Sequence, residues 1–253
     1  MTRARTTLSR RLELAACVLD HEARTGRGLG VVAVAQRVGR EKTQVSRGLA
    51  ALADVAMVER LPEGDGFATG VEILALAAAA GDARMVAAAW PRLEALTIRF
   101  GERAELAVLD GGEVLTVEST ASASAIQIAG WPGRRLPAHC TAAGQVLLAG
   151  AAPELVERVV GAGRLPPGGP AAPRTAAAAR RRIAAARRDG FAISDEELDT
   201  DVVSVAAPIR VDGRTVAAVI LTGPGYRFRA DVGEAGSALV AAAAEIAAAV
   251  AAS

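Results

Sequence analysis

The chain has 253 residues, 51% of them hydrophobic, and a formal net charge of +1. This length allows one large or two modest domains, and this hydrophobic content excludes a mainly disordered protein. No uninterrupted apolar run reaches the length of a membrane span, and no apolar signal segment follows the arginine-rich N-terminus. We therefore expect a cytoplasmic protein with no membrane partner.

Cysteines and histidines are too few and too poorly spaced to indicate a metal site. Cys17 and Cys140 lie far apart without metal-ligand spacing, and only His21 and His139 are available to join them. The glycines of GRGLG at 26–30 lack the spacing of a phosphate-binding loop. We predict no metal, no cofactor and no disulfide framework.

The small net charge hides an asymmetry along the chain. Residues 1–60 contain 11 basic and 6 acidic side chains, a balance of +5, whereas the remainder has a balance of −4. Because contacts to phosphates supply much of the affinity of DNA-binding proteins, a basic N-terminal module on a mildly acidic body is typical of a DNA-anchored sensor.

Three helices are predicted in this basic region. Their apolar residues recur at spacings of three and four. The sets are Leu8, Leu12, Ala15 and Leu19; Val31, Val34, Ala35 and Val38; and Val45, Leu49, Leu52 and Ala56. Gly39 is placed to end the second helix in a left-handed conformation, so the last two helices are predicted to form a helix-turn-helix.

The third predicted helix begins with polar side chains that lie mostly away from its apolar face. These are Lys42, which is the chain's only lysine, with Thr43, Gln44, Ser46 and Arg47. Arginine can pair bidentately with guanine and glutamine with adenine, so the set fits a DNA-reading helix. A solvated helix face is the plainer alternative, and the scarcity of lysine also fits a genome rich in GC.

The following segments predict a wing, a linker and a second domain. Short apolar stretches flank the turn-forming PEGDG within residues 58–70, which indicates a hairpin. We assign residues 1–70 to a winged helix-turn-helix domain and 71–90 to an alanine-rich linker helix with a possible break at Gly81 and Asp82. Pro91 is expected to start a new helix.

The second domain, residues 91–253, alternates predicted strands with helices. Its strands are 103–110, 113–120, 124–129, 202–211 and 214–223; its helices are 142–150, 153–160, 175–190 and about 231–252. The turns GG and DG join strand pairs as hairpins. Since no steady strand–helix–strand alternation is present, we predict an antiparallel α+β fold with helices on the faces of the sheet.

Four segments in order give the chain a family resemblance. They are the helix-turn-helix with its wing, LPAHCTAAGQVLLA at 136–149, RRDGFAISDEELDTDVVSVAAPIRV at 187–211 and VAAVILTGP at 216–224. Together they resemble an IclR-type transcriptional regulator. The resemblance implies a winged helix-turn-helix joined to a GAF-like effector-binding domain. It also implies a homodimer or a tetramer of two dimers, and in many members repression of a neighbouring catabolic operon until a small metabolite binds.

The resemblance also implies the residues of two sites. Bases in the major groove would face Thr43, Gln44, Ser46 and Arg47, with Lys42 and Arg40 on phosphates. An operator for such a dimer would be roughly palindromic, with half-sites about 34 Å apart or a multiple of it. The effector pocket would take the backbone after Thr141 together with Ala142, Ala143, Ser194, Val202, Ser204, Ile220 and Thr222.

Two departures from the family pattern bear on the effector. In relatives that sense small keto acids, the positions of Ser194 and Ile220 carry a carboxylate and a hydroxyl. We therefore expect a less polar cavity for a larger, partly apolar or aromatic molecule, with Ser204 and Thr222 fixing its polar end. Those two hydroxyls could instead only satisfy backbone groups. Trp131 either covers the pocket or packs its own loop.

A small-molecule hydrolase with Cys140 or Ser204 as nucleophile is the alternative function. Neither residue has an evident base partner and oriented third group, and this hypothesis explains neither the helix-turn-helix nor the wing. His139 and Cys140 are expected to be a packed or surface pair. The acidic run DEELD at 195–199 is expected to be a solvated loop. We predict that the chain is not an enzyme.

Overall fold

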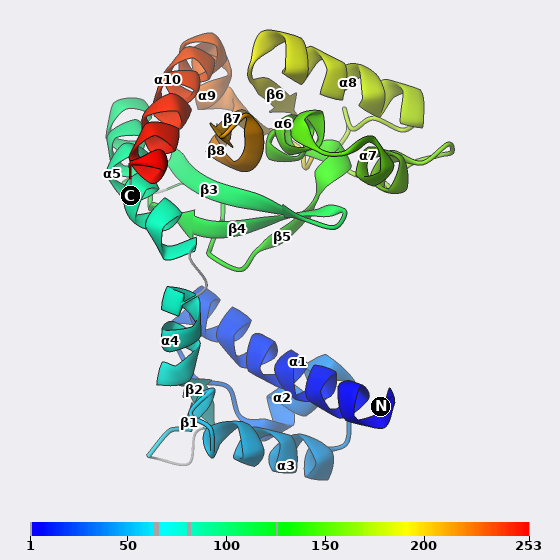
Figure 1. Ribbon diagram of the computed structural model, residues 1–253, viewed down its shortest axis with the longest axis vertical. Coiled ribbons are helices and arrows are strands. Elements are labelled where there is room, and N and C mark those ends of the chain that lie inside the picture. The colour runs from blue at the N-terminus through cyan, green and yellow to red at the C-terminus, as the bar shows by residue number, and fades with distance from the viewer. Residues whose placement is uncertain (1, 63–65, 80–81, 125, 253) are drawn as a thin grey trace. The chain divides into compact units, whose positions relative to one another are not determined.

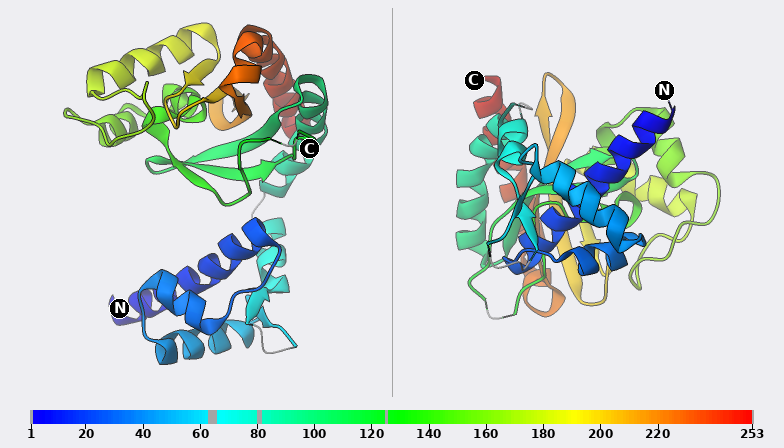
Figure 2. Two further views of the ribbon diagram at one scale, coloured as in Figure 1. Left: turned by 180° about the vertical axis from the view of Figure 1, so that it is seen from behind. Right: turned by 90° about the horizontal axis from the view of Figure 1, so that it is seen from below.

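The computed structural model describes residues 2–62, 66–79, 82–124 and 126–252. The chain divides into two compact units, residues 1–83 and 84–253 (Figures 1 and 2). Helices and a two-stranded sheet form the first unit, and a mixed helix and sheet structure forms the second. Each unit has its own hydrophobic core.

The described residues of the first unit form three helices, a small antiparallel hairpin and a fourth helix. These are α1 (Thr2–Thr25), α2 (Val31–Val38), α3 (Lys42–Ala53), β1 (Val58–Arg60), β2 (Phe67–Thr69) and α4 (Val71–Ala79). Gly39 ends α2 with φ 63°, and its N–H donates to the carbonyl of Ala35. This left-handed end confirms the predicted tight turn. In the predicted wing, Glu63, Gly64 and Asp65 lie outside the described residues.

Helix α1 buries a face that shares Ala15 with the predicted one but not Leu12 or Leu19, and the side chain of Leu8 lies outside those that the structure describes. Leu14, Ala15 and Val18 are in the core, whereas Leu12 and Leu19 are 46% and 40% exposed. The reason lies on α3, where a Cβ on Gly48 would come 2.5 Å from Leu14 Cδ1. Glycine at this position therefore lets Leu14 pack directly on the α3 backbone, which accounts for a residue of low helix propensity inside that helix.

A six-stranded antiparallel sheet, counted over the described residues, forms the centre of the second unit. Its order is β5-β4-β3-β8-β7-β6. The strands are β3 (Arg103–Asp110), β4 (Glu113–Ser119), β5 (Arg135–Pro137), β6 (Ala192–Asp195), β7 (Val202–Val211) and β8 (Arg214–Pro224). The predicted hairpins at GG and DG join β3 to β4 and β7 to β8. Asp212 and Gly213 both have positive φ, which a tight hairpin turn requires.

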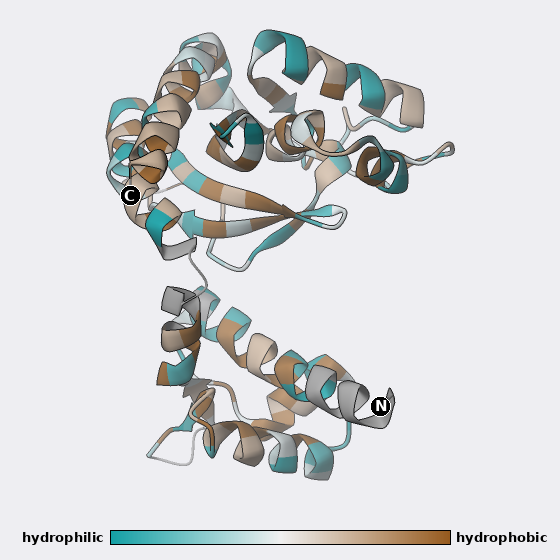
Figure 3. Ribbon diagram, in the orientation of Figure 1, coloured by the Kyte–Doolittle hydropathy of each residue, from teal (hydrophilic) through white to brown (hydrophobic). Residues whose placement is uncertain are grey.

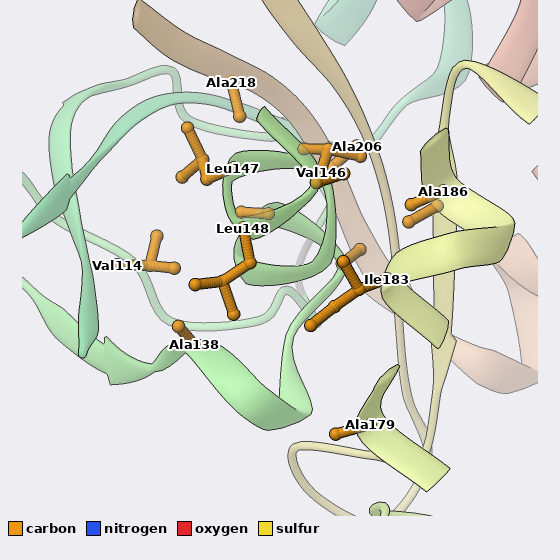
Figure 4. Packing of buried hydrophobic residues seen from close by; sticks show 14 of the residues in the cluster. Val114, Ala138, Val146, Leu147, Leu148, Ala179, Ile183, Ala186, Ala206 and Ala218 are labelled. Carbon is orange, nitrogen blue, oxygen red and sulfur yellow. The ribbon is translucent and has the colours of Figure 1, made fainter. Parts of the chain in front are cut away.

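Helices cover both faces of this sheet. They are α5 (Asp82–Phe100), α6 (Ala142–Gly150), α7 (Pro153–Val160), α8 (Ala176–Asp189), α9 (Gly225–Phe228) and α10 (Val232–Ala251), with short 3-10 turns η1 (Ala138–Cys140) and η2 (Arg229–Asp231). One core packs α5 and α10 against one face, and the other packs α6 and α8 against the opposite face. In Figure 4, Ile183 of α8 lies beside α6, whose Leu147 and Leu148 point toward Ala218 and Val114.

Hydropathy follows these layers. Figure 3 shows hydrophobic segments along β3, whereas α8 alternates between hydrophilic and apolar segments. Helix α6 is buried at every position from Ala142 to Ala149, because the sheet lies on one side and α8 on the other. The predicted antiparallel α+β arrangement of this unit is confirmed.

The second unit departs from the sequence prediction in its strands, where β5 and β6 were not predicted, and at Pro91. Segment 124–129 forms no strand in its described residues; Arg103 instead donates to the Ile128 carbonyl and to Gln127 Oε1. Pro91 lies inside α5 and does not start it. A proline there removes a backbone hydrogen bond, and burial of Ala89 and Leu93 in the second core offsets the loss. The second unit therefore begins before residue 91.

One helical stretch, Gly225–Ala251, is long and apolar enough to cross a membrane by length and composition alone. The stretch is not an uninterrupted apolar run, because it includes Arg227, Arg229 and Glu234. Within the stretch, Ala235, Leu239 and Ile246 of α10 are buried against the sheet. The apolar character of α10 is therefore accounted for by its place in the core.

Candidate functional site

Helix α3 presents a polar row on the surface of the first unit. Val45, Leu49 and Leu52 are buried and fix the orientation of the helix about its axis. The exposed side chains of the row are Lys42, Thr43, Gln44, Ser46 and Arg47. The structure thus places all five predicted side chains of this helix on one accessible side, as their spacing indicated. Ala56, predicted on the buried side, lies beyond the helix end at Ala53.

Arg40 is held by helix α1. Its guanidinium donates to a carboxylate oxygen of Glu13 and, at 3.3 Å, to the carbonyl of Arg10. The side chain is only 25% exposed. Arg40 therefore ties the α2–α3 turn to α1, a structural contact that the sequence prediction of a phosphate-binding role did not include.

In the second unit, a small cavity opens at the N-terminal end of α6. Its volume is about 30 Å³. It is lined by Glu105, Val114, Thr116, Ile128, Arg134, Leu136, Thr141, Ala142, Ala143, Leu198, Ser204, Ile220 and Thr222. Six of the nine predicted effector residues are in this set, so the structure brings together most of the residues that the resemblance indicated.

The end of α6 is shaped by a capping threonine. Thr141 Oγ1 accepts from the Gly144 N–H at 3.1 Å, and the Thr141 carbonyl accepts from Gln145 N–H at 3.0 Å. The first amides of a helix have no acceptor within it, so those of Ala142 and Ala143 are donors at the cavity wall. The positive end of the helix dipole favours an anionic group at this wall.

Two charged residues outside the predicted effector set, Glu105 and Arg134, also line the cavity. Glu105 is on β3 and is 8% exposed; burial raises the pKa of its carboxyl, against the lowering effect of Arg103 and Arg134 and a hydrogen bond with Thr222. Ser204 Oγ lies 3.2 Å from Thr222 Oγ1. Glu105, Arg134 and these hydroxyls give the cavity a polar part beside its apolar lining, and the expectation of a cavity less polar than in keto-acid-sensing relatives stays a prediction. The sequence signal that could have identified Glu105 was an acidic residue at an inward-facing position of a largely apolar strand.

Three predicted effector residues do not line the cavity. Ser194 and Val202 are buried beside it, on β6 and at the start of β7. Trp131 lies in the loop before β5, and the guanidinium of Arg134 stacks 5.3 Å from its ring centroid. Trp131 thus contacts a residue of the cavity wall without being part of that wall.

Cys140 and Ser204, the nucleophiles of the alternative hypothesis, lack the surroundings of a nucleophile. Burial and the nearby Glu197 raise the pKa of the Cys140 thiol to about 11, which keeps it protonated. His139 is buried as well, and its ring nitrogen lies 3.2 Å from the Pro166 carbonyl, as expected for a packed residue. Ser204 contacts the hydroxyl of Thr222, which cannot act as its base.

The acidic run at 195–199 is not simply a solvated loop. Glu197 has a side chain only 2% exposed, which accepts from Gln145 Nε2 at 2.8 Å and pairs with Arg182 Nε at 3.0 Å. Burial raises the pKa of this carboxyl to about 7. The next residue, Leu198, lines the cavity. Among the described residues, no group of three or more His, Cys, Asp and Glu side chains could hold a metal ion.

These features combine a small recess next to a capped helix in one unit with an exposed polar helix in the other. Residues 77–248 match the family model "Bacterial transcriptional regulator IclR C-terminal", so the chain belongs to the IclR family of transcriptional regulators. The family assignment made from the sequence is confirmed.

Individual relatives cover most of the chain. The HTH-type transcriptional regulator Rv1719 of Mycobacterium tuberculosis is 28% identical over 214 residues, covering 85% of this chain and 82% of the relative. The regulator XynR of Escherichia coli is 26% identical over 215 residues, covering 83% and 84%. An IclR homolog from Microbacterium hydrocarbonoxydans, solved with 4-hydroxybenzoate, superposes with a TM-score of 0.82 at 26% identity, covering 98% and 100%. These relatives are regulators and not enzymes, so the hydrolase alternative is set aside.

Proposed function

We propose that this protein is an effector-responsive, DNA-binding repressor of a neighbouring catabolic operon. Residues 1–70 act as a winged helix-turn-helix, α4 as a linker, and the second unit as a GAF-like effector domain. The protein works in the cytoplasm as a homodimer on a roughly palindromic operator, alone or as two joined dimers. The observation that carries the proposal is the row of exposed polar side chains on α3, oriented by its three buried apolar residues.

The chemistry of the α3 row assigns different tasks to its members. Arg47 and Gln44 carry the two-pronged groups that pair with guanine and adenine, and Thr43 and Ser46 add less selective contacts. Lys42 is the first residue of α3, where unpaired backbone amides also favour a phosphate. Arg40 is paired with Glu13, so it would contact a phosphate only where the phosphate displaces that carboxylate.

The effector is a carboxylic acid with an apolar or aromatic body. Arg134 and the amides at the start of α6 supply the anion-binding end, and Glu105, Ser204 and Thr222 supply hydrogen bonds for a polar substituent. The apolar body would contact Ile128, Leu136, Leu198 and Ile220 among the lining residues. A volume of about 30 Å³ holds about one water molecule, so such a ligand requires the surrounding loops to move outward. We expect this movement to couple effector binding to the conformation of the DNA-binding unit.

DNA binding is tested by fluorescence anisotropy on labelled DNA from upstream of the protein's own gene, with excess unrelated DNA at physiological salt. We expect saturable binding that survives the competitor. Replacing Arg47 or Gln44 by Ala should each cost about 1–3 kcal/mol of specific binding. The variant Arg210→Gln, an exposed arginine in β7, is the control and should bind normally. Binding that is equally weak on every DNA would contradict the proposal.

The effector class is tested by thermal shift with 4-hydroxybenzoate, benzoate and glyoxylate. We expect stabilisation by the aromatic acids, lost in Arg134→Gln. The adjacent Arg135→Gln is the matched control, because Arg135 pairs with Asp110 at 2.6 Å on the surface. A tight complex with glyoxylate and none with an aromatic acid would refute this ligand class.

A further inference from the structure

A second basic feature of the first unit lies beside the row on α3. A cleft of about 290 Å³ opens between α1 and α3. It is lined by Arg10, Arg11, Leu14, Arg40, Gln44, Val45, Arg47 and Gly48. Four of these eight residues are arginines, and no acidic side chain is among them. Such a concentration of like charge in one recess is unfavourable by itself and attracts an anion.

Close packing of the two helices creates this cleft. Leu14 packs against α3 at Gly48, where any larger residue would bring a Cβ within 2.5 Å of its Cδ1. Arg40 fixes α1 from the other side through Glu13. These contacts hold the first described side chains of α1, Arg10 and Arg11, next to Arg47.

The charge of the cleft is available to a ligand. Arg40 is partly neutralised by Glu13, but Arg10, Arg11 and Arg47 are exposed. Over the part of the chain that the structure describes, no ion pair joins any of these three guanidinium groups to an acidic side chain. Gln44 of the same wall belongs to the row that is proposed to face bases, so an anion in the cleft would flank those bases.

We propose that Arg10 and Arg11 of α1, together with Arg47 of α3, bind a phosphate of the DNA backbone in this cleft. The inference rests on the proposed function and adds a second element, α1, to the DNA interface. Arg47 belongs both to the polar row on α3 and to the cleft. One edge of its guanidinium can face a base while the other edge contacts the phosphate in the cleft. Contacts of this kind raise affinity for every sequence and fix the register of the helix on the duplex.

The test compares salt dependence in the full-length protein. Affinity for the operator fragment is measured by anisotropy from 50 to 300 mM salt for the wild type and for Arg10→Gln/Arg11→Gln. The control is Arg210→Gln/Arg214→Gln, which removes two exposed charges from the β7–β8 hairpin of the other unit. Circular dichroism establishes that each variant is folded.

We expect the slope of log affinity against log salt to fall by about 1 per protomer in the α1 variant, as one phosphate contact is lost. Affinity at 150 mM salt should fall about tenfold or more on operator and unrelated DNA alike, and the hairpin variant should match the wild type. An α1 variant with the wild-type slope and affinity would overturn this inference and leave the proposed function standing. A wild-type protein that binds no DNA would overturn both.

Discussion

Protonation of Glu197 should make the stability of the second unit depend on pH. This carboxyl is buried between α6 and α8, with one hydrogen bond from Gln145 and one ion pair with the half-exposed Arg182. Its pKa rises from the ordinary 4.5 to about 7, chiefly because burial disfavours the charged form. The folded protein therefore keeps the proton over a pH range in which the unfolded chain has lost it.

The sign and size of the effect follow from this difference. A raised folded pKa contributes stability that is complete below pH 4.5 and is lost as the pH rises to about 7. The whole change corresponds to about 3 kcal/mol, of which about 2–3 kcal/mol falls between pH 5 and 8. Glu197→Gln has no titrating group at this position but keeps an oxygen that can accept from Gln145. The variant should be close to the wild type in stability at pH 5 and more stable at pH 8.

Tryptophan fluorescence during urea unfolding isolates this effect. The chain has two tryptophans, and both Trp90 and Trp131 lie in the second unit, so the signal reports on that unit. Subtracting the unfolding free energy of the variant from that of the wild type at each pH removes the contribution of other titrating groups. Glu113→Gln, which removes a half-exposed carboxylate of β4, is the control and should keep the wild-type pH profile. Parallel profiles for wild type and Glu197→Gln would refute the argument.

Two further predictions concern other buried groups. Arg227→Gln leaves the carboxylate of Glu102, which is 1% exposed, without its ion pair, and should cost about 3 kcal/mol or more of unfolding free energy in the same assay. Arg229→Gln, whose carboxylate partner is 42% exposed, should cost less than about 1 kcal/mol, and equal losses would contradict the distinction. In the folded protein at pH 8, a thiol reagent should modify Cys17, which is partly exposed, well before Cys140, whose pKa is about 11. Faster labelling in Cys17→Ser than in Cys140→Ser would reverse that order.

Regular patterns in the sequence predicted much of the fold. Two apolar stretches joined by the DG turn were enough for the β7–β8 hairpin, because the turn is determined by local residues. The buried face of α1 could not be predicted in this way, since Leu12 and Leu14 are equally apolar. Leu14 is the one that packs against α3, because Gly48, 34 positions further along the chain, leaves room for it. Helical continuity at Pro91 likewise depends on the packing of its neighbours in the core.

The site was predicted where it resembled the family and missed where buried charge was involved. Thr141, Ala142 and Ala143 form one continuous segment, so a motif identifies them together. Glu105 is a single acidic residue in an apolar strand, and Glu197 lies in an acidic run typical of a solvated loop; the burial of each depends on partners from remote elements. Their roles become visible only when the sheet brings β3 beside β8 and places the β6–β7 loop against α6.

Glu105 differs from the other two buried carboxylates in a way that favours a ligand. Glu102 and Glu197 each pair directly with an arginine. No ion pair involving Glu105 is present among the described residues. Arg103 and Arg134 lower the pKa of this carboxyl through their charge, but both donate to carbonyl oxygens of the 120–129 loop. A ligand hydroxyl that donates to this carboxylate would stabilise its ionised form, whereas an apolar ligand end would favour its protonated form. On this argument, the cavity should distinguish 4-hydroxybenzoate from benzoate at the Glu105 end and bind their common carboxylate at the α6 end.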